Sequence, residues 1–329
     1  MTLRTALFEL ARQHTLDRPA ATRLLGLAGF ERPPAALHTT LWRTVAVIAA
    51  ALGGLGLVMW IAANWESLGR FMRFALLQGF VLAMCAGAAF RAGARAPLAM
   101  LALLGTGALF AYFGQTYQTG ADPWQLFAVW AVLTLPLALA VRSDVVWVPW
   151  NLVAMVGISL WAQAHTGHSW RVSPADMTVH LVSLGAALAV AAAMLPQAQR
   201  FTGAGVWALR TAGTLALMMV TLTALGGLFH SPVAGHYGLG LVLLAAAAAL
   251  VGMRTHFDIF LLSGAALGLN ILLVTGLARA MFSNSRVGDF VGSLLLIGLV
   301  AAGLLAATVN LVMRLARRAA SQQGQGDAA

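Results

Sequence analysis

Residues 114–136 read GQTYQTGADPWQLFAVWAVLTLP and join two apolar segments through a short polar turn. The turn contains Asp122, one of only 10 acidic residues in a chain of 329. Trp124 and Trp130 then begin the second apolar segment. Tryptophan is enriched where a transmembrane helix meets the water interface. The stretch therefore predicts a turn at the non-cytoplasmic rim of a helical membrane protein.

The composition of the whole chain supports this class of protein. Hydrophobic residues make up 60% of the chain, charged residues make up 9%, and the mean hydropathy is +0.83. A soluble domain has about 25% charged residues, so this chain has too few to cover a water-exposed surface. Its formal charge of +10 comes from arginine, without lysine, and the arginines are dispersed at the ends of apolar runs. This dispersal favours the lipid bilayer over nucleic acid as the partner.

About ten apolar stretches are each near the ~20 residues that a helix needs to cross a ~30 Å hydrocarbon core. Backbone polar groups in lipid must be paired within their own segment, so we expect these stretches to be helices. The predicted fold class is therefore an all-α polytopic integral membrane protein. The predicted spans are 44–63, 71–90, 97–115, 124–141, 145–162, 178–195, 207–228, 237–253, 258–278 and 289–313.

The placement of arginine predicts the orientation of these spans, because cytosolic loops carry an excess of positive charge. With the N-terminus inside, only five of the 20 arginines fall outside: Arg70, Arg73, Arg171, Arg279 and Arg286. An odd number of spans would move the basic cluster at 314–318 to the outer side. We therefore expect both termini in the cytosol.

Three regions follow from this layout. Residues 1–43 predict a short cytosolic helical hairpin, in which Asp17 is suited to cap the second helix. The hairpin either docks against the bundle or serves as a regulatory or partner-binding module. Residues 44–313 form the transmembrane bundle. Residues 314–329 form a short basic, then polar, cytosolic tail, whose end, SQQGQGDAA, we expect to be disordered.

Polar side chains inside the predicted spans are few and mild. No Asp, Glu, Lys or Arg falls in the middle third of any predicted span. Ion-coupled pumps keep a carboxylate at that depth, so its absence argues against a proton- or sodium-driven transporter. The remaining polar side chains are expected to bond neighbouring helices rather than line a path: Gln78, Asn151, Asn270 and Asn310.

Small and aromatic residues predict how the helices pack and where they are anchored. Gly264 and Gly268 form a GxxxG pair, which lets two helices approach closely. We favour packing within the chain over a dimer face. Several tryptophans lie near predicted span ends, where interfacial anchors belong: Trp60, Trp65, Trp124, Trp147, Trp150, Trp161 and Trp170.

Polar and titratable residues gather at the predicted outer rim, and Asp122 there could either cap the helix that begins near Pro123 or contact a ligand. His165 and His168 are three residues apart, a spacing that can place two metal ligands on one helical turn. Their loop, AHTGHSWRV, has no fixed register, so solvated histidines are the plainer interpretation. The candidate ligand-binding residues are Asn64, Trp65, Glu66, Gln115, Tyr117, Asp122 and Trp124.

Two segments resemble a known family. The first is Ile61-Ala62-Ala63-Asn64-Trp65, then Leu68-Gly69-Arg70 and Phe74-Ala75-Leu76-Leu77. The second is Gly114-Gln115-x-Tyr117, then Gly120-x-Asp122-Pro123-Trp124-x-Leu126, Trp130-Ala131 and Leu135-Pro136. Both resemble the bacterial domain-of-unknown-function family 2157 of predicted polytopic membrane proteins, over about residues 1–165. Ala121, between Gly120 and Asp122, departs from the family's usual Gly-Asp pair. The resemblance implies a short cytosolic helical N-terminus before a multi-span bundle in a bacterial inner (cytoplasmic) membrane, and it implies no particular reaction.

Three functional hypotheses remain open at this point. The first is a non-enzymatic inner-membrane protein that binds or transports a small solute or lipid through its helical bundle. The second is an envelope scaffold or accessory subunit, whose glycine-rich helix faces pack against another membrane protein or a second copy. The third is a membrane-embedded enzyme that uses His and Asp residues of the outer face. We favour the first, and we expect no catalytic residue and no cofactor.

Overall fold

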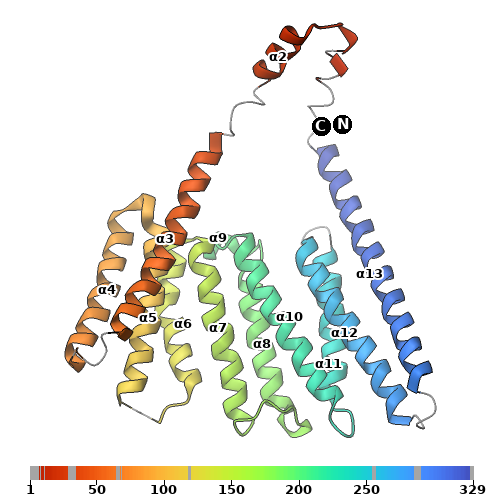
Figure 1. Ribbon diagram of the computed structural model, residues 1–329. Coiled ribbons are helices and arrows are strands. Elements are labelled where there is room, and N and C mark those ends of the chain that lie inside the picture. The colour runs from red at the N-terminus through yellow and green to blue at the C-terminus, as the bar shows by residue number, and fades with distance from the viewer. Residues whose placement is uncertain are drawn as a thin grey trace. The chain divides into compact units, whose positions relative to one another are not determined.

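The computed structural model describes residues 7, 9–10, 12–28, 35–63, 67, 69–117, 120–253, 257–284 and 290–326. All the regular structure in these ranges is helical, as Figure 1 shows. The chain divides into two compact units, Met1–Gly56 and Leu57–Ala329, and each is described by itself.

The N-terminal unit contains the helix that the sequence predicted after Asp17. Helix α2 spans Arg18–Leu27, and the Asp17 carboxylate accepts a hydrogen bond from the backbone N–H of Ala20 at 3.0 Å. Pro19 lies in the first turn, where its missing N–H costs nothing. The first helix of the expected hairpin falls largely on residues outside the described ranges. Helix α3, Ala35–Ala63, begins nine residues before the predicted span at 44.

Ten helices in the described part of the chain are long and apolar enough to cross a membrane, which confirms the polytopic helical class and the ten predicted spans. Their ends lie within a few residues of the predicted ones, except at the start of α3 and at the ends of α12 and α13. Short helices η1 (Ala92–Ala94), η2 (Pro174–Asp176) and α9 (Gln199–Thr202) lie in the connections. After α3, the spans are α4 (Arg70–Phe90), α5 (Arg95–Tyr117), α6 (Pro123–Val141), α7 (Asp144–His165), α8 (Met177–Ala193), α10 (Val206–Leu228), α11 (Gly235–Gly252), α12 (Ile259–Asn284) and α13 (Phe290–Gly326).

The C-terminal helix differs from the prediction. Helix α13 continues to Gly326, so the expectation of a disordered end was wrong for residues 321–326. The sequence after the span is rich in arginine, alanine and glutamine, which are strong helix formers. These residues extend the last turn of the span without needing an apolar partner.

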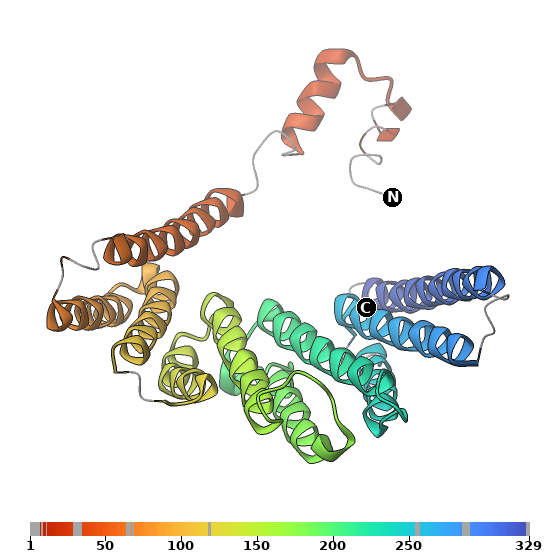
Figure 2. The ribbon, with the colours of Figure 1, turned by 60° about the horizontal axis from the view of Figure 1, so that its bottom comes forward.

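The helices of the second unit form a central row with flanking helices. Helices α5, α7, α10 and α12 contact one another in that order, and α6, α8 and α11 each pack against two neighbours in the row. Helices α4 and α13 cover the two ends, against α5 and α12. Figure 2 shows how these helices follow one another. Inside the most apolar stretch of each helix, the buried share is 44% for α5 and α7 and 33% for α10 and α12, against 6% to 17% for the flanking helices. The helices of the central row are therefore more buried within the protein than the flanking helices are.

Glycines allow close contact within the bundle at several of these interfaces. The indole of Trp130 on α6 lies where a side chain on Gly107 of α5 would have to be, and its Nε1 donates to the carbonyl of Leu103 at 2.9 Å. The GxxxG glycines of α12 likewise face α10, where Leu217 and Thr221 approach Gly264 and Gly268. The preference for packing within the chain is confirmed at this pair.

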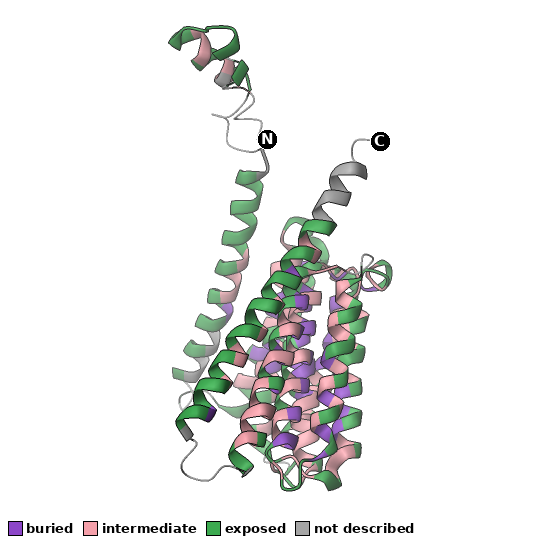
Figure 3. Ribbon diagram, turned by 90° about the vertical axis from the view of Figure 1, so that its right-hand side faces the viewer, coloured by how far each residue is buried: buried purple, intermediate pink, exposed green. Residues whose placement is uncertain are grey.

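Two tryptophans expected at the membrane interface lie inside the bundle instead. Trp147 is 1% exposed and Trp150 is 8% exposed. Their Nε1 atoms each donate a hydrogen bond of 2.9 Å, from Trp147 to the carbonyl of Thr202 and from Trp150 to the carbonyl of Ala131. The buried positions, purple in Figure 3, lie between the helices. The anchor prediction was wrong for this pair, because a position near the end of a span does not determine which side of the helix meets lipid.

The amide side chains of two spans bond neighbouring helices, as predicted. Asn151 of α7 is fully buried, and its Nδ2 donates to the carbonyl of Ala208 on α10 at 3.0 Å. Asn270 of α12 pairs with Thr308 of α13, with Nδ2 donating to Oγ1 at 3.1 Å. Each bond joins two spans and satisfies a polar group that lipid could not.

Candidate functional site

The structure separates the predicted rim into two clusters. Three residues of the predicted rim lie outside the described residues: Asn64, Trp65 and Glu66. Gln115 and Tyr117 end α5, and the Tyr117 ring lies 5.9 Å from Phe74 and 4.8 Å from Phe113, centroid to centroid. The Arg70 guanidinium lies 5.9 Å from the same Tyr117 ring. This first cluster joins α4 to α5.

The second cluster contains Asp122, which stands at the N-cap position of α6 as predicted but makes no side-chain capping bond. Its carboxylate Oδ1 lies 3.0 Å from Nε2 of His168, in the loop between α7 and α8. The side chains are 39% exposed for Asp122 and 64% exposed for His168. The capping interpretation of the carboxylate was therefore wrong, and the group faces a second loop at the surface.

The two histidines that were metal-ligand candidates have separate partners. His165 Nδ1 donates to the carbonyl of Trp161 at 2.8 Å, since a carbonyl can only accept. Its ring packs against Trp161 and Trp124, with centroids 4.4 Å and 6.0 Å away. His168 instead turns to Asp122 from a left-handed backbone conformation, with φ of 57°. His165 therefore packs against aromatic rings and His168 pairs with an acid, and the two histidines have separate partners.

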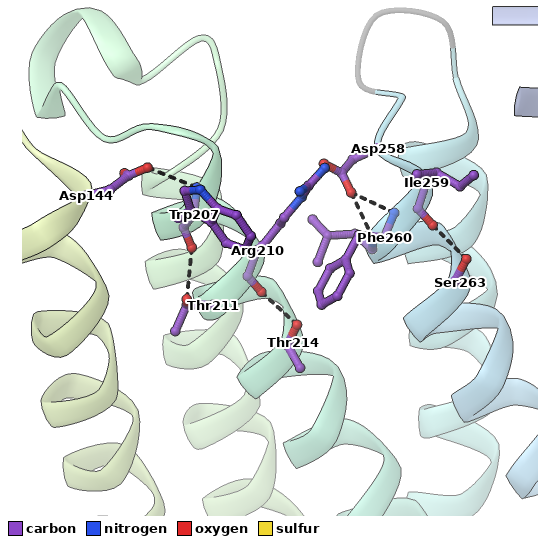
Figure 4. A network of polar contacts seen from close by, with 10 residues as sticks. Asp144, Trp207, Arg210, Thr211, Thr214, Asp258, Ile259, Phe260 and Ser263 are labelled. Atoms are coloured by element: carbon purple, nitrogen blue, oxygen red, sulfur yellow. Dashed lines mark hydrogen bonds and ion pairs between the residues drawn. The ribbon is translucent and has the colours of Figure 1, made fainter. Parts of the chain in front are cut away.

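A third polar cluster lies where α7, α10 and α12 begin (Figure 4). The Asp144 carboxylate at the start of α7 accepts from the backbone N–H of Gly205 at 2.6 Å and of Trp207 at 3.0 Å, so it caps α10 from another helix. Asp258 accepts from two N–H groups in the first turn of α12 and pairs with Arg210 of α10 at 3.0 Å. Every acceptor here is used to hold helix ends, which makes this cluster a structural one.

A groove opens between α11, α12 and α13. Its volume is about 420 Å³, and apolar side chains line it except at two positions, Asn270 and Thr308. Those two side chains bond each other in both directions, at 3.1 Å and 3.3 Å. The groove is therefore an apolar surface whose two polar side chains are already hydrogen-bonded to each other.

Comparison with known proteins gives one match. Residues 8–147 match the family model described as predicted membrane protein (DUF2157). The resemblance inferred from residues 1–165 is thereby confirmed over this range. No curated protein and no solved structure matches the chain.

The DUF2157 match covers the helices from α2 to α6 and the first turn of α7. The rim residues before α7 lie inside it, and the groove lies after it. The sequence carried no signal for the groove, since its lining repeats the alanine and leucine of every span. One further polar pair, His180 and His236, is separated by more than fifty residues and is brought together only by the fold.

Replacing Asp122 by asparagine is expected to lower the free energy of unfolding by no more than about 1 kcal/mol, because exposed ion pairs contribute little. The measurement is the thermal midpoint of the purified protein in detergent, with His168→Ala and the double variant completing a cycle. A loss as large as that of a buried core variant would contradict the exposed position of this pair.

Proposed function

We propose that the protein is a non-enzymatic protein of the bacterial inner membrane that binds a lipid hydrocarbon chain in the groove between α11, α12 and α13. Both termini are proposed to lie in the cytosol, on the arginine distribution given above. The chain is established as a multi-pass membrane protein by its ten apolar helices and by the family match. The groove is the observation that carries the proposal.

The position of the groove suits an acyl chain. At one end of the groove, Asn270 lies near the middle of α12 and Thr308 lies within the α13 span. At the other end, Gly252 ends α11 and Leu262 lies in the first turn of α12, beside Leu315 of α13. The groove therefore runs from the middle of the bilayer toward one headgroup layer. A lipid chain extends over the same depth, and an apolar chain fits a lining whose polar groups are already paired.

The charge beside the groove fits the same ligand. Arg314 and Arg317 lie on either side of the groove residue Leu315 on α13 and are exposed. Basic side chains at a membrane surface attract anionic lipid headgroups. A phospholipid with its chain in the groove would place its phosphate near these two arginines.

Filling the groove tests the proposal. Ala266→Phe adds an aromatic ring inside the groove, and Ala302→Phe adds the same ring on the exposed face of α13 as a matched control. An acyl chain displaced from the groove enters lipid that is equally apolar, so the ring weakens lipid retention by excluding the chain and removing its packing contacts rather than through a transfer term. Native mass spectrometry of protein extracted from nanodiscs gives the lipid retained per chain.

The expected result is a loss of bound phospholipid in Ala266→Phe and none in Ala302→Phe. Equal retention in both variants would overturn lipid binding at this groove. Loss of a dimer or of a stoichiometric membrane-protein partner in Ala266→Phe, without loss of lipid, would favour the scaffold or accessory-subunit hypothesis instead.

We propose the outer rim as a second binding surface, for a polar small solute. The observation that favours it is the Asp122 carboxylate, which no helix cap uses and which remains partly exposed beside His168. Gln115 and Trp124 lie on the adjoining ends of α5 and α6. Solute binding in nanodiscs, compared between the parent, Asp122→Ala and Gln115→Ala, tests this surface, and unchanged binding in both variants would count against it.

A further inference from the structure

Two histidines of different helices meet inside the bundle. His180 is the fourth residue of α8 and His236 is the second residue of α11. Their rings lie edge to face, with centroids 4.8 Å apart and planes at 86°. His180 is 8% exposed and His236 is 1% exposed. Gly227 of α10 allows the start of α11 to approach α10 closely, because a Cβ there would come within 2.7 Å of the His236 Cβ.

The hydrogen bonds of the pair leave ring nitrogens available. His180 Nδ1 lies 3.0 Å from the carbonyl oxygen of Asp176 and must donate to it, so the lone pair of the neutral ring is on Nε2. Metal-binding histidines are held by the same kind of bond from their other nitrogen. Both ring nitrogens of His236 are buried without a hydrogen-bond partner. Burying a polar group without a hydrogen-bond partner costs free energy, so a ligand bound to this ring would stabilise it.

A methionine lies beside the pair. Met177 precedes His180 by one helical turn on the same face of α8. Its terminal methyl group lies 3.0 Å from the position that a Cβ would take on Gly235, the residue before His236. The end of the Met177 side chain therefore reaches the first residue of α11, which directly precedes His236.

We propose that His180, His236 and Met177 form a binding site for a soft monovalent cation, Cu(I). Two imidazole nitrogens and a thioether sulfur are donors that suit this ion. An ion about 2.0–2.1 Å from a ring nitrogen lies about 3 Å from the centroid of that ring, so two rings whose centroids are 4.8 Å apart can share one ion. The site is independent of the groove, which lies at the other end of α11.

The donor set also argues against zinc, the metal that histidines more commonly bind. Among the described residues, no group of three or more His, Cys, Asp or Glu could hold a metal ion. A closed zinc site with four nitrogen, sulfur or carboxylate ligands is therefore not formed there. The three donors are neutral, and a divalent ion would leave twice the uncompensated charge in a poorly solvated position.

The test is a Cu(I) titration of the full chain in nanodiscs under reducing conditions, against a chromophoric Cu(I) chelator. We expect one Cu(I) per chain. His236→Phe, which keeps an aromatic ring without donors, and His180→Gln should each weaken binding about 100-fold, and Met177→Leu about tenfold. His165→Phe, at the same side of the bundle, is the matched control and should bind like the parent. X-ray absorption at the copper edge should find two nitrogens and one sulfur.

Three results would overturn the site. One is equal Cu(I) affinity in the parent and in His236→Phe, and another is a copper spectrum without sulfur that Met177→Leu leaves unchanged. The third is Zn²⁺ binding as tight as Cu(I) binding in competition. Met177→Leu keeps the volume of the side chain, so it reports on the site even if a histidine variant fails to fold.

Discussion

Replacing Trp147 by alanine is expected to lower the stability of the bundle by about 3 kcal/mol, the largest effect of any substitution considered for the fold. Trp147 is 1% exposed, packs edge to face on Trp150 with centroids 5.2 Å apart, and bonds the Thr202 carbonyl. Separated helices would expose the ring to lipid rather than to water, so little of the loss is a transfer term. Most of it comes from a cavity of up to about 140 Å³, at about 24 cal/mol per Å³.

The measurement is the thermal midpoint of unfolding in detergent, which we expect to fall by about 5–10 °C. Trp147→Phe should lower the midpoint less than Trp147→Ala, because it keeps most of the aromatic volume and removes only the N–H donor and part of the ring. Trp170→Ala is the control, since Trp170 is 70% exposed and its removal leaves no cavity. Similar midpoints for Trp147→Ala and Trp170→Ala would show that Trp147 faces lipid.

Replacing Asp144 by alanine should have the second largest effect, a loss of about 2–3 kcal/mol. Its carboxylate accepts two backbone N–H groups at the start of α10 from the start of α7. Hydrogen bonds to a charged acceptor contribute about 1.5–3 kcal/mol each, and the lower end applies because the side chain is only partly buried. The substitution would leave the first turn of α10 uncapped and loosen its contact with α7.

Asp144→Asn keeps one acceptor oxygen and should lose about half as much. Asp122→Asn makes the same chemical change at a helix start whose carboxylate does not cap, and it should lose much less. Thermal midpoints of the three variants, measured in one detergent, compare them directly. Equal losses for Asp144→Asn and Asp122→Asn would contradict the cross-helix cap.

The number of spans and most of their ends could be predicted from the sequence, because hydrocarbon imposes length and composition on each helix separately. Asp17 as a cap and Asn270 as an interhelical group followed from local chemistry in the same way. The rotation of each helix about its axis did not follow. Trp147 and Trp150 were therefore assigned to the interface, and the structure places them in the core.

The candidate site was predictable only in part, for a related reason. Asp122 was correctly placed at the start of a helix, but its partner, His168, belongs to a loop 46 residues later. The contact between His180 and His236 depends on α8 and α11 being brought together around α10. Spacing along the chain carries no information about such pairs.

The four helices of the central row run in the same direction, so their N-terminal ends share one side of the bundle. Consecutive spans alternate in direction, so α5, α7, α10 and α12, which are alternate spans, all run the same way. The four partially positive N-terminal ends of the row therefore lie at one face of the membrane. Asp144 and Asp258 lie at that face, each accepting N–H groups from the first turn of a helix in the row. Asp144 therefore brings a negative charge to one of these ends, whereas the charge of Asp258 is paired with Arg210.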